Sequence, residues 1–381
     1  MLLEGNEKKM VEKKNVCIIG LGFVGLTLGL VLSESGFSVV GVDKNSKVVE
    51  GIKNERPHFF EKGLSELLSA QLNKRFTSFT SIPKDQNFDI YVVSVGTPIH
   101  NDNKPNFSQL ENVSNELGGV LKKGDLVILR STVPVGVTRD FVIPLLERNS
   151  GMSVDNNDFF VAFAPERTVE GDAIHELKVL PQVVGGYNKN STTLASEMFE
   201  VFAPEVVLVD SLEEAEMVKV INNSYRDLIF AFANELVLIC GMFNIDTNKI
   251  VDAANRGYAR SSVPKPSPGV GGYCLTKDPY LLVYSSLKKG DYSPLLPTIS
   301  RKINTGMPNY MYKRIINFLD NKCADVEEKH VTLLGLAFKG NPPTSDVRFS
   351  PTIDLVKLLK SRGGIQLFGH DYLVSKNIFD E

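Results

Sequence analysis

Near its N-terminus the chain reads Asn15-Val16-Cys17-Ile18-Ile19-Gly20-Leu21-Gly22-Phe23-Val24-Gly25, an apolar segment that runs directly into the glycine pattern GxGxxG. The apolar residues 15–19 predict a buried strand, and residues 26–35 continue as a predicted helix. A second apolar strand is predicted at 38–42, and it ends in Asp43, about twenty residues after the glycines. This order of strand, glycine turn, helix, strand and acid is typical of a dinucleotide-binding unit with a parallel sheet.

Each part of this pattern has an expected physical function. Gly20 is expected to form the tight turn, Gly22 to let a pyrophosphate approach the helix N-terminus, and Gly25 to let the helix pack closely on the strand. The carboxylate of Asp43 can accept from a ribose 2′-hydroxyl and would repel a 2′-phosphate, which favours NAD over NADP. The positive charge of Lys47 nearby favours phosphate. The alternative is a glycine turn that binds nothing.

The composition excludes several classes of protein. A chain of 381 residues is expected to form two or three domains, and 43% hydrophobic with 23% charged residues is typical of globular proteins. The net charge of -3 gives no indication of a nucleic-acid surface. The cysteines form no CxxC pair, so neither a metal site nor a disulfide framework is predicted, and a reducing cytoplasm is the expected compartment.

The start of the chain also resembles a signal peptide, because residues 16–32 are almost wholly apolar and follow Lys13-Lys14. Several glycines interrupt this segment and no small-residue cleavage site follows it. A buried strand that leads into a phosphate-binding turn explains the segment better, so no membrane span is predicted. The polar residues 1–14 are predicted to be a flexible extension.

Polar residues follow three further predicted strands. The strand at 90–95 leads into Gly96-Thr97-Pro98, and the strand at 126–129 leads into Arg130-Ser131-Thr132-Val133-Pro134. In an open parallel sheet, ligands gather at the carboxyl ends of the strands, so both turns are expected in the cofactor crevice. The strand at 159–164 ends in Pro165-Glu166-Arg167-Thr168-Val169-Glu170-Gly171, which offers carboxylates for proton transfer and an arginine for recognition. Ordinary turn chemistry is the alternative for all three.

Residues 211–243 predict a long helix that links two domains, because apolar residues recur there at helical spacing without a proline. Lys219 and Asn223 lie four residues apart on one face, where an ammonium and an amide could donate to a developing oxyanion. The alternative is an exposed polar face. Shorter strands are predicted at 183–186 and 206–209.

A lone cysteine follows a pair of glycines in the stretch Pro268-Gly269-Val270-Gly271-Gly272-Tyr273-Cys274-Leu275-Thr276-Lys277-Asp278-Pro279. If a helix begins directly after the glycines, Cys274 lies in its first turn, where amide dipoles favour the nucleophilic thiolate. Asp278 would share that helix face, and a thiolate beside a carboxylate suits covalent attack on a carbonyl followed by hydrolysis. A buried structural cysteine is the alternative.

The C-terminal residues predict a strand at 329–336, a helix at 350–360 and a strand at 364–368. This is the first half of a second dinucleotide-type unit, and it is too short for a complete doubly wound domain. We therefore expect an α/β protein with a Rossmann-like parallel sheet, a central long-helix domain and a partial Rossmann-like C-terminal half. The expected domains are 1–14 (extension), 15–210 (NAD-binding), 211–322 (helical, with the cysteine loop) and 323–381 (the partial C-terminal half).

Taken together and in order, these motifs resemble the nucleotide-sugar 6-dehydrogenases, the family of UDP-glucose, GDP-mannose and UDP-N-acetylhexosamine dehydrogenases. The resemblance runs from about residue 15 to the C-terminus and includes Lys339, Asp346 and Arg348. It implies oxidation of a sugar C6 hydroxyl to a carboxylate with two NAD molecules, to supply surface polysaccharide precursors. Cys274 would hold the intermediates as a thiohemiacetal and then a thioester.

The resemblance also implies a function for each matching residue. The implied catalytic residues are Cys274, Lys219, Asn223, Asp278, Glu166 and Thr132. The implied NAD-binding residues are Gly20, Gly22, Phe23, Val24, Gly25, Asp43, Lys47, Thr97, Thr132, Glu170 and Arg348. The implied nucleotide-sugar-binding residues are Glu166, Arg167, Lys219, Asn223, Arg260, Gly271, Phe338 and Lys339. In this family the residue at Arg260 can cross to a neighbouring subunit, which implies a homodimer.

The motifs do not decide which branch of the family, and therefore which sugar substrate, this chain matches. The residues Pro268 to Gly272 and the Asp278-Pro279-Tyr280 sequence resemble the UDP-N-acetylhexosamine branch, which favours UDP-N-acetylmannosamine or UDP-N-acetylglucosamine. Tyr273 stands where that branch usually has histidine, and Thr276-Lys277 resembles the UDP-glucose branch. Two other classes stay in consideration: a two-electron hydroxyacid dehydrogenase of the 6-phosphogluconate type, and an inactive nucleotide-sugar-binding protein, which the short C-terminal half suggests.

Overall fold

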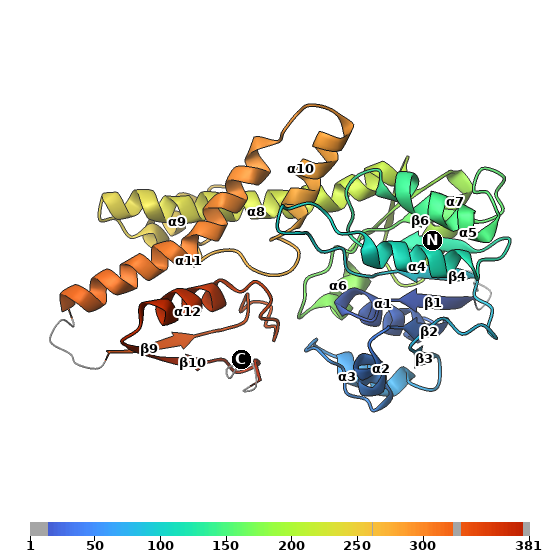
Figure 1. The fold of residues 1–381 in the computed structure, drawn as a ribbon, viewed down its shortest axis with the longest axis horizontal. Helices are drawn as coiled ribbons and strands as arrows, with labels where there is room; N and C mark the ends of the chain where they lie inside the picture. Colours follow the sequence, from blue (N-terminus) through green and yellow to red (C-terminus); the bar gives the residue numbers. More distant parts are fainter. Residues whose placement is uncertain (1–13, 261, 323–328, 376–381) are drawn as a thin grey trace, which may run out of the picture. The chain divides into compact units, whose positions relative to one another are not determined.

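The computed structural model describes residues 14–260, 262–322 and 329–375. The expected extension at 1–14 lies outside these residues except for its last position, and so does the expected domain start at 323. The chain divides into two compact units (Figure 1). Unit 1 runs to His100 and continues over Pro105–Lys219, and unit 2 comprises Asn101–Lys104 and the chain from Val220 onward. The predicted domain boundaries stay predictions.

Unit 1 is built around an eight-stranded sheet in the order β3-β2-β1-β4-β5-β6-β7-β8. Its strands are β1 (Asn15–Ile19), β2 (Ser38–Val42), β3 (Phe76–Phe79), β4 (Ile90–Val93), β5 (Leu126–Leu129), β6 (Phe160–Phe163), β7 (Gln182–Gly186) and β8 (Val206–Val209). All neighbouring pairs are parallel except β6 and β7. The first six strands have the order of a doubly wound dinucleotide-binding sheet, so the predicted fold class is confirmed.

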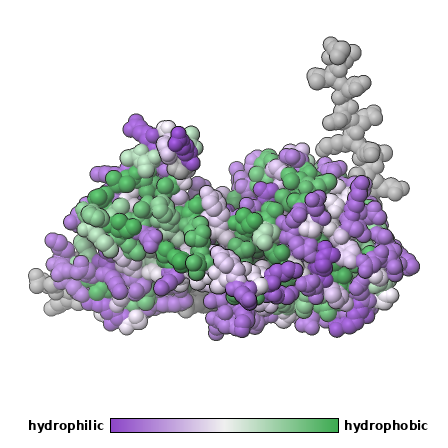
Figure 2. All heavy atoms as spheres, turned by 90° about the horizontal axis from the view of Figure 1, so that it is seen from above, coloured by the Kyte–Doolittle hydropathy of each residue, from purple (hydrophilic) through white to green (hydrophobic). Residues whose placement is uncertain are grey.

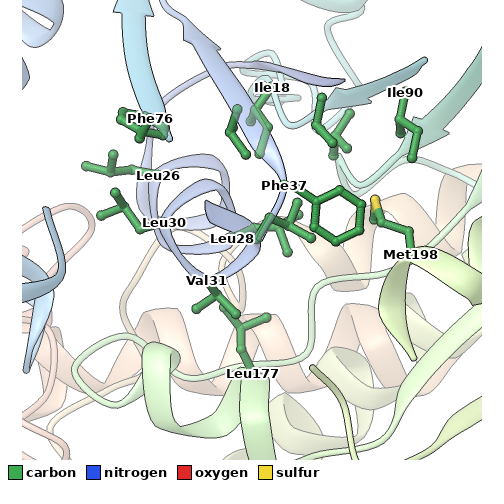
Figure 3. Close-up of a cluster of buried hydrophobic side chains, with 14 of the residues drawn as sticks. Ile18, Leu26, Leu28, Leu30, Val31, Phe37, Phe76, Ile90, Leu177 and Met198 are labelled. Atoms are coloured by element: carbon green, nitrogen blue, oxygen red, sulfur yellow. The ribbon is translucent and has the colours of Figure 1, made fainter. Parts of the chain in front are cut away.

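Helices flank this sheet. They are α1 (Phe23–Glu34), α2 (Ser46–Lys53), α3 (Leu64–Gln71), α4 (Ser108–Gly118), the π-helix η1 (Thr138–Val142), α5 (Ile143–Ser150), α6 (Ala173–Val179) and α7 (Lys189–Phe199). Residues 25–33 of α1 are all buried, as expected of a helix that is apolar on every side. Figure 3 shows side chains of α1 within a cluster that also includes Ile18 of β1, Phe76 of β3 and Met198 of α7. This packing fixes the start of α1 beside the end of β1.

Helix α8 (Leu212–Met242) matches the long helix predicted from the apolar spacing. Its first turn carries Glu213 and Glu214, whose charges favour the N-terminus of a helix. Leu212 and Ala215 belong to the hydrophobic core of unit 1, whereas the helix from Val220 onward belongs to unit 2. One continuous helix therefore serves both units.

The described residues of unit 2 form four further helices and a small parallel sheet. Its elements are α9 (Thr247–Asn255), α10 (Asp278–Lys289), α11 (Leu295–Lys322), β9 (Lys329–Leu334), α12 (Pro351–Arg362) and β10 (Ile365–His370). The predicted strand–helix–strand order at the C-terminal end is confirmed. Buried Asp227 of α8 binds Arg301 at 2.7 Å and Ser300 and Asn304 at 2.8 Å, which ties α8 to α11. No helix in the described ranges combines the length and the apolar character that crossing a membrane requires.

Candidate active site

The glycine turn after β1 has the backbone geometry that its sequence predicts. Gly20 has a φ of 97°, in the left-handed region that favours glycine. A Cβ on Gly25 would lie 1.8 Å from the carbonyl oxygen of Gly20, so only glycine lets α1 approach the strand this closely. A Cβ on Gly22, the N-cap residue of α1, would meet no atom within 4 Å. The turn therefore leaves open space at the start of α1, where backbone N–H groups and the helix dipole favour an anion.

The ends of β2 and β4 complete this cradle. The Asp43 carboxylate accepts hydrogen bonds from the backbone N–H groups of Leu21 and Asn45, each at 2.9 Å, so it is held against the glycine turn. The Ser94 hydroxyl donates to the carbonyl oxygen of Gly20 at 2.8 Å. These contacts lie at the β1–β4 switch point of the sheet, where dinucleotides bind in this fold. The space at Gly22, the placement of Asp43 and the helix N-terminus fit an NAD molecule.

The turns after β4 and β5 are joined directly. The Thr97 side chain is buried, and its hydroxyl donates to the backbone carbonyl of Thr132. Thr132 itself is half-buried. The predicted strand ends are thus brought together at one edge of the sheet. Their binding of NAD stays a prediction.

A buried ion pair follows β5 and β6. Arg130 donates to the Glu166 carboxylate at 2.7 and 3.0 Å and to the side chain of Gln182 at 3.0 Å, and its guanidinium lies over the Phe199 ring. The other oxygen of Glu166 accepts from the N–H groups of Arg167 and Thr168, at 2.7 and 2.8 Å. Both carboxylate oxygens of Glu166 therefore already have donors.

The charge state of Glu166 follows from these contacts. Burial alone would raise the pKa of this carboxyl, but the Arg130 charge and the backbone N–H of Thr168 outweigh it and hold the pKa below its usual value. A group that stays ionised and saturated with donors is suited to positioning its neighbours more than to proton transfer. One neighbour is Lys219, whose ammonium donates to the backbone carbonyl of Glu166. Proton transfer by Glu166 stays a prediction.

Lys219 and Asn223 are one helical turn apart on α8, and their side chains are only 8% and 7% exposed. The alternative of an exposed polar face is therefore wrong. A buried ammonium and a buried amide are both suited to stabilising negative charge, because a hydrogen bond is stronger where water is excluded.

Cys274 lies in a turn before α10, so the condition that a helix begins directly after the glycines is not met. Helix α10 begins at Asp278, and Pro279 sits at its first positions, where a fixed φ and a missing N–H are tolerated. The Cys274 carbonyl accepts from the N–H groups of Lys277 and Asp278, at 3.2 and 2.9 Å. Its side chain is exposed, which excludes the alternative of a buried structural cysteine.

A buried polar cluster lies immediately after Cys274. The Asp278 carboxylate is fully buried and accepts from the Lys277 ammonium at 2.6 Å and from the Asn223 amide at 2.5 Å. The predicted i, i+4 relation of Asp278 to Cys274 is realised through a backbone hydrogen bond and not through a shared helix face. Both carboxylate oxygens of Asp278 therefore have a donor, as those of Glu166 do, and the position of the side chain is fixed.

The cysteine loop packs against the segment 338–351 of the same unit. A Cβ on Gly271 would lie 2.4 Å from the Phe349 carbonyl oxygen, and a Cβ on Gly272 would lie 2.7 Å from the Phe338 ring. The Gly272 N–H donates to the carbonyl of Arg348 at 3.2 Å. The structure thus brings the predicted residues Gly271, Phe338 and Arg348 close to Cys274 within unit 2.

The remaining predicted residues are more dispersed. Lys47 is exposed at the start of α2, and Arg167 is exposed and donates weakly to the Pro181 carbonyl at 3.4 Å. Arg260 is exposed beside the Tyr258 ring, and the Lys339 ammonium lies 5.7 Å from the Phe338 ring centroid. Their assigned functions stay predictions, as do those of Phe23, Val24 and Glu170.

Two functional candidates were missed by sequence reasoning. Arg130 and Lys277 are charged residues with side chains 0% and 5% exposed, each paired with a predicted site carboxylate. The available signal for Arg130 was its position directly after a wholly apolar strand. For Lys277 it was the neighbouring Asp278. In the described part of the chain, no group of His, Cys, Asp or Glu side chains is arranged to hold a metal ion.

Comparisons with known proteins agree with this geometry. Residues 14–203 match the NAD binding domain of the UDP-glucose/GDP-mannose dehydrogenase family, and residues 213–305 match its central domain. UDP-N-acetyl-D-mannosamine dehydrogenase from Campylobacter jejuni is 33% identical over 94% of this chain and 86% of its own length. UDP-N-acetyl-D-glucosamine 6-dehydrogenase from Salmonella typhi is 36% identical over 92% of this chain and 80% of its own length.

A solved structure supports the same conclusion. The UDP-D-ManNAc dehydrogenase of Pyrococcus horikoshii superposes with a TM-score of 0.87 at 29% identity, over 95% of this chain and 84% of that one. The dinucleotide cradle in unit 1, the cysteine loop in unit 2 and the matches over both units point the same way. The chain belongs to the UDP-glucose/GDP-mannose dehydrogenase family and is an NAD-dependent oxidoreductase of nucleotide sugars.

Proposed function

We propose that this protein oxidises the C6 hydroxyl of a UDP-N-acetylhexosamine, UDP-N-acetylmannosamine or UDP-N-acetylglucosamine, to a carboxylate. The observation that carries this proposal is the exposed thiol of Cys274 next to the buried Asn223–Asp278–Lys277 cluster. The relatives named for these two sugars, at 33% and 36% identity, support the choice of substrate. The comparisons give no support to the inactive alternative.

The chemistry needs a residue that retains the half-oxidised sugar. When bound, NAD supplies the acceptor for one hydride in each of two oxidations. After the first, the Cys274 thiolate adds to the C6 aldehyde and forms a thiohemiacetal. The second oxidation converts this adduct to a thioester. Water then attacks the thioester carbonyl, the C–S bond breaks, and the acid leaves with the thiol regenerated.

The oxyanions in this sequence need donors. We assign Lys219 and Asn223 to this task, because each is a buried donor that could turn to a developing negative charge. Asp278 would orient or activate the hydrolytic water, and Glu166 with Thr132 would hold the surrounding groups and serve proton transfer. Arg167, Arg260, Gly271, Phe338 and Lys339 are proposed to bind the nucleotide sugar.

We also propose a homodimer that uses α8. Tyr225, Phe232 and Ile239 of this helix are 62%, 52% and 44% exposed and recur every seven residues, so they form one apolar stripe. Figure 2 shows a broad apolar area on unit 2. An exposed apolar surface of this kind marks an interaction site, and a second copy of the chain is the occupant that the family resemblance implies. The expected compartment is the cytoplasm, where a thiol nucleophile stays reduced.

A substrate panel tests the function. UDP-N-acetylmannosamine, UDP-N-acetylglucosamine, UDP-glucose and GDP-mannose are each incubated with NAD, and the NADH formed per sugar consumed is measured. We expect two NADH per UDP-N-acetylhexosamine and loss of the acid product in Cys274→Ala. A ratio of one with full activity in Cys274→Ala would indicate a hydroxyacid dehydrogenase instead. Two NADH with UDP-glucose alone would move the substrate to the other branch.

A further inference from the structure

Two cations lie near the ring of Tyr273. The Lys277 ammonium lies 5.2 Å from the ring centroid and the Arg348 guanidinium lies 5.1 Å from it. Both distances are within the range of a cation–π interaction. Tyr273 directly precedes Cys274 in the chain, so the ring that both cations contact belongs to the residue beside the nucleophile.

Two contacts hold the Lys277 side chain in place. Its side chain is 5% exposed, it lies on the Tyr273 ring, and it forms an ion pair with fully buried Asp278 at 2.6 Å. Burial alone would lower the pKa of this ammonium, but the charges of Asp278 and Cys274 together raise the pKa above its usual value. Lys277 therefore stays charged over the whole range in which a thiol titrates.

The attraction between this charge and the cysteine is mutual. Because a Cys274 thiolate favours the charged form of Lys277, the Lys277 ammonium favours the thiolate by the same interaction energy. The backbone places the two residues together, since the Lys277 N–H donates to the Cys274 carbonyl at 3.2 Å. A positive charge close to a thiol favours its ionised form.

The Tyr273 ring is anchored by the segment behind it. Arg348 is bound to the Asp346 carboxylate at 2.6 to 3.0 Å, and its carbonyl accepts from the Gly272 N–H. The Phe349 ring lies 6.5 Å from that of Tyr273. The ring is thus a fixed surface that limits where the flexible lysine side chain can place its ammonium.

We propose that Lys277 stabilises the Cys274 thiolate, and that Tyr273 is the positioning residue that holds this ammonium beside the cysteine. This inference deepens the proposed function and rests on it, because it explains how an exposed thiol on a turn becomes a nucleophile. It assigns a function to two of the three residues at which the loop departs from the UDP-N-acetylhexosamine branch, Tyr273 and Lys277.

The test measures how fast iodoacetamide alkylates Cys274 as a function of pH. The thiolate displaces iodide, so the rate follows the ionised fraction, and mass spectrometry of the peptide that contains Cys274 isolates this thiol from the others. Lys277→Met is expected to move the midpoint of the profile up by about one pH unit, whereas Lys277→Arg keeps the charge and leaves the midpoint in place. Lys357→Met is the matched control, because Lys357 pairs with Asp354 on the surface of α12.

Tyr273 is tested by a second pair of variants. Tyr273→Phe keeps the ring and is expected to behave as the wild type, whereas Tyr273→Leu removes the ring and is expected to move the midpoint in the same direction as Lys277→Met. A purely structural effect would change the rate at every pH without moving the midpoint. Equal midpoints in wild type and Lys277→Met would overturn the proposal. If Lys277→Met does not fold, equal midpoints in Tyr273→Phe and Tyr273→Leu would overturn it.

Alkylation needs no substrate, so this test and the substrate panel can fail separately. A midpoint that depends on Lys277 without NADH formation from any nucleotide sugar would refute the proposed function and leave the thiol activation intact. NADH formation with a midpoint that ignores both Lys277 and Tyr273 would refute the activation alone.

Discussion

Arg130 distributes its donors over Glu166, Gln182 and the Ala164 carbonyl, all inside unit 1. Removing one member of a buried ion pair leaves the other charge uncompensated, which is far more costly than losing a surface pair. We therefore predict that Arg130→Met lowers the free energy of unfolding by about 3–5 kcal/mol, measured by urea titration.

Arg139 provides the control for this prediction. It forms an ion pair with Glu213 at 2.6 Å, but the two side chains are 38% and 31% exposed. Arg139→Met is expected to cost less than about 1 kcal/mol. A similar loss of unfolding free energy in Arg130→Met and Arg139→Met would contradict the prediction that the buried ion pair contributes more to stability than the surface pair.

Two of the three glycines of the turn, Gly22 and Gly25, allow a paired prediction. Gly25→Ala would place a Cβ 1.8 Å from the Gly20 oxygen, so we expect the thermal midpoint to fall sharply or the protein not to fold. Gly22→Ala adds a methyl group to open space and keeps an allowed backbone, because the φ of Gly22 is -74°. It is expected to leave the thermal midpoint nearly unchanged and to weaken NAD binding, measured by calorimetry. Unchanged NAD affinity in Gly22→Ala would contradict the placement of the pyrophosphate.

At the scale of single residues, the sequence identifies functional residues when they belong to a short local motif. The glycine turn and Cys274 stand in short motifs whose spacing carries their chemistry. Arg130 and Glu166 are 36 residues apart, and Asn223 and Asp278 are 55 apart, so no local spacing reveals these contacts. A buried charge is recognisable only when the fold has brought its partner to it.

At the scale of the elements, the first turns of α8 carry a buried carboxylate, Glu216, that is held by backbone N–H groups. Glu216 is fully buried and accepts from the N–H groups of Gly136 and Thr138, at 2.6 and 2.9 Å, which fixes α8 to the start of η1. Burial is the main cause that raises its pKa, to about 7, and the nearby charge of Glu213 raises it further. Below pH 4.5 the group is protonated whether the chain is folded or not.

This raised pKa predicts how stability changes with pH. Because the folded-state pKa is above the unfolded one, the stabilising contribution is complete below about pH 4.5 and is lost as the pH rises through about 7. The loss amounts to roughly 3 kcal/mol at most. Glu216→Gln should remove this part of the pH dependence, measured by urea unfolding between pH 4 and 8. Glu214→Gln, an exposed change in the same turn, should keep it, and an equal slope in both variants would refute the assignment.

Helices and strands were predicted correctly where their apolar residues form a long or continuous pattern. The apolar strands β1, β2, β5 and β8 and the long helix α8 match their predicted ranges to within a residue at each end. The half-polar strand β3 and the short helices α2, α3, α4 and α9 were not predicted, because a few residues on a partly exposed surface give no clear period. No helix begins directly after the glycines, because residues 273–277 form a turn. The Lys277 and Asp278 N–H groups donate to the Cys274 carbonyl, and the Thr276 hydroxyl donates to the Gly272 carbonyl.

At the scale of the whole molecule, the apolar stripe on α8 predicts the assembly state. Phe232→Glu places a charge at its centre and is expected to convert a dimer into a monomer, measured by light scattering after gel filtration. Leu208→Glu is the control, because Leu208 is a similarly exposed apolar residue, 56% exposed, on β8 of unit 1. A mass unaffected by Phe232→Glu, or a wild-type mass equal to one chain, would contradict the proposed dimer.

The organisation into units was only partly predictable from sequence. The change from alternating strands and helices to one long helix is visible near residue 211, yet along the chain the boundary between the compact units falls after Lys219, within that helix. The first turns of α8 pack into the core of unit 1 through Leu212 and Ala215. A change in sequence pattern marks where an element begins, whereas the packing decides which unit it stabilises.

The unequal burial of the thiols has a practical consequence. Cys17 lies in the core, and burial raises its pKa to about 12, while Cys240 is also buried and Cys274 faces solvent. A maleimide dye added at neutral pH should therefore attach to Cys274 and spare those two. If the nucleotide sugar binds beside Cys274 as proposed, its arrival would change the emission of the dye, and binding could be followed without turnover.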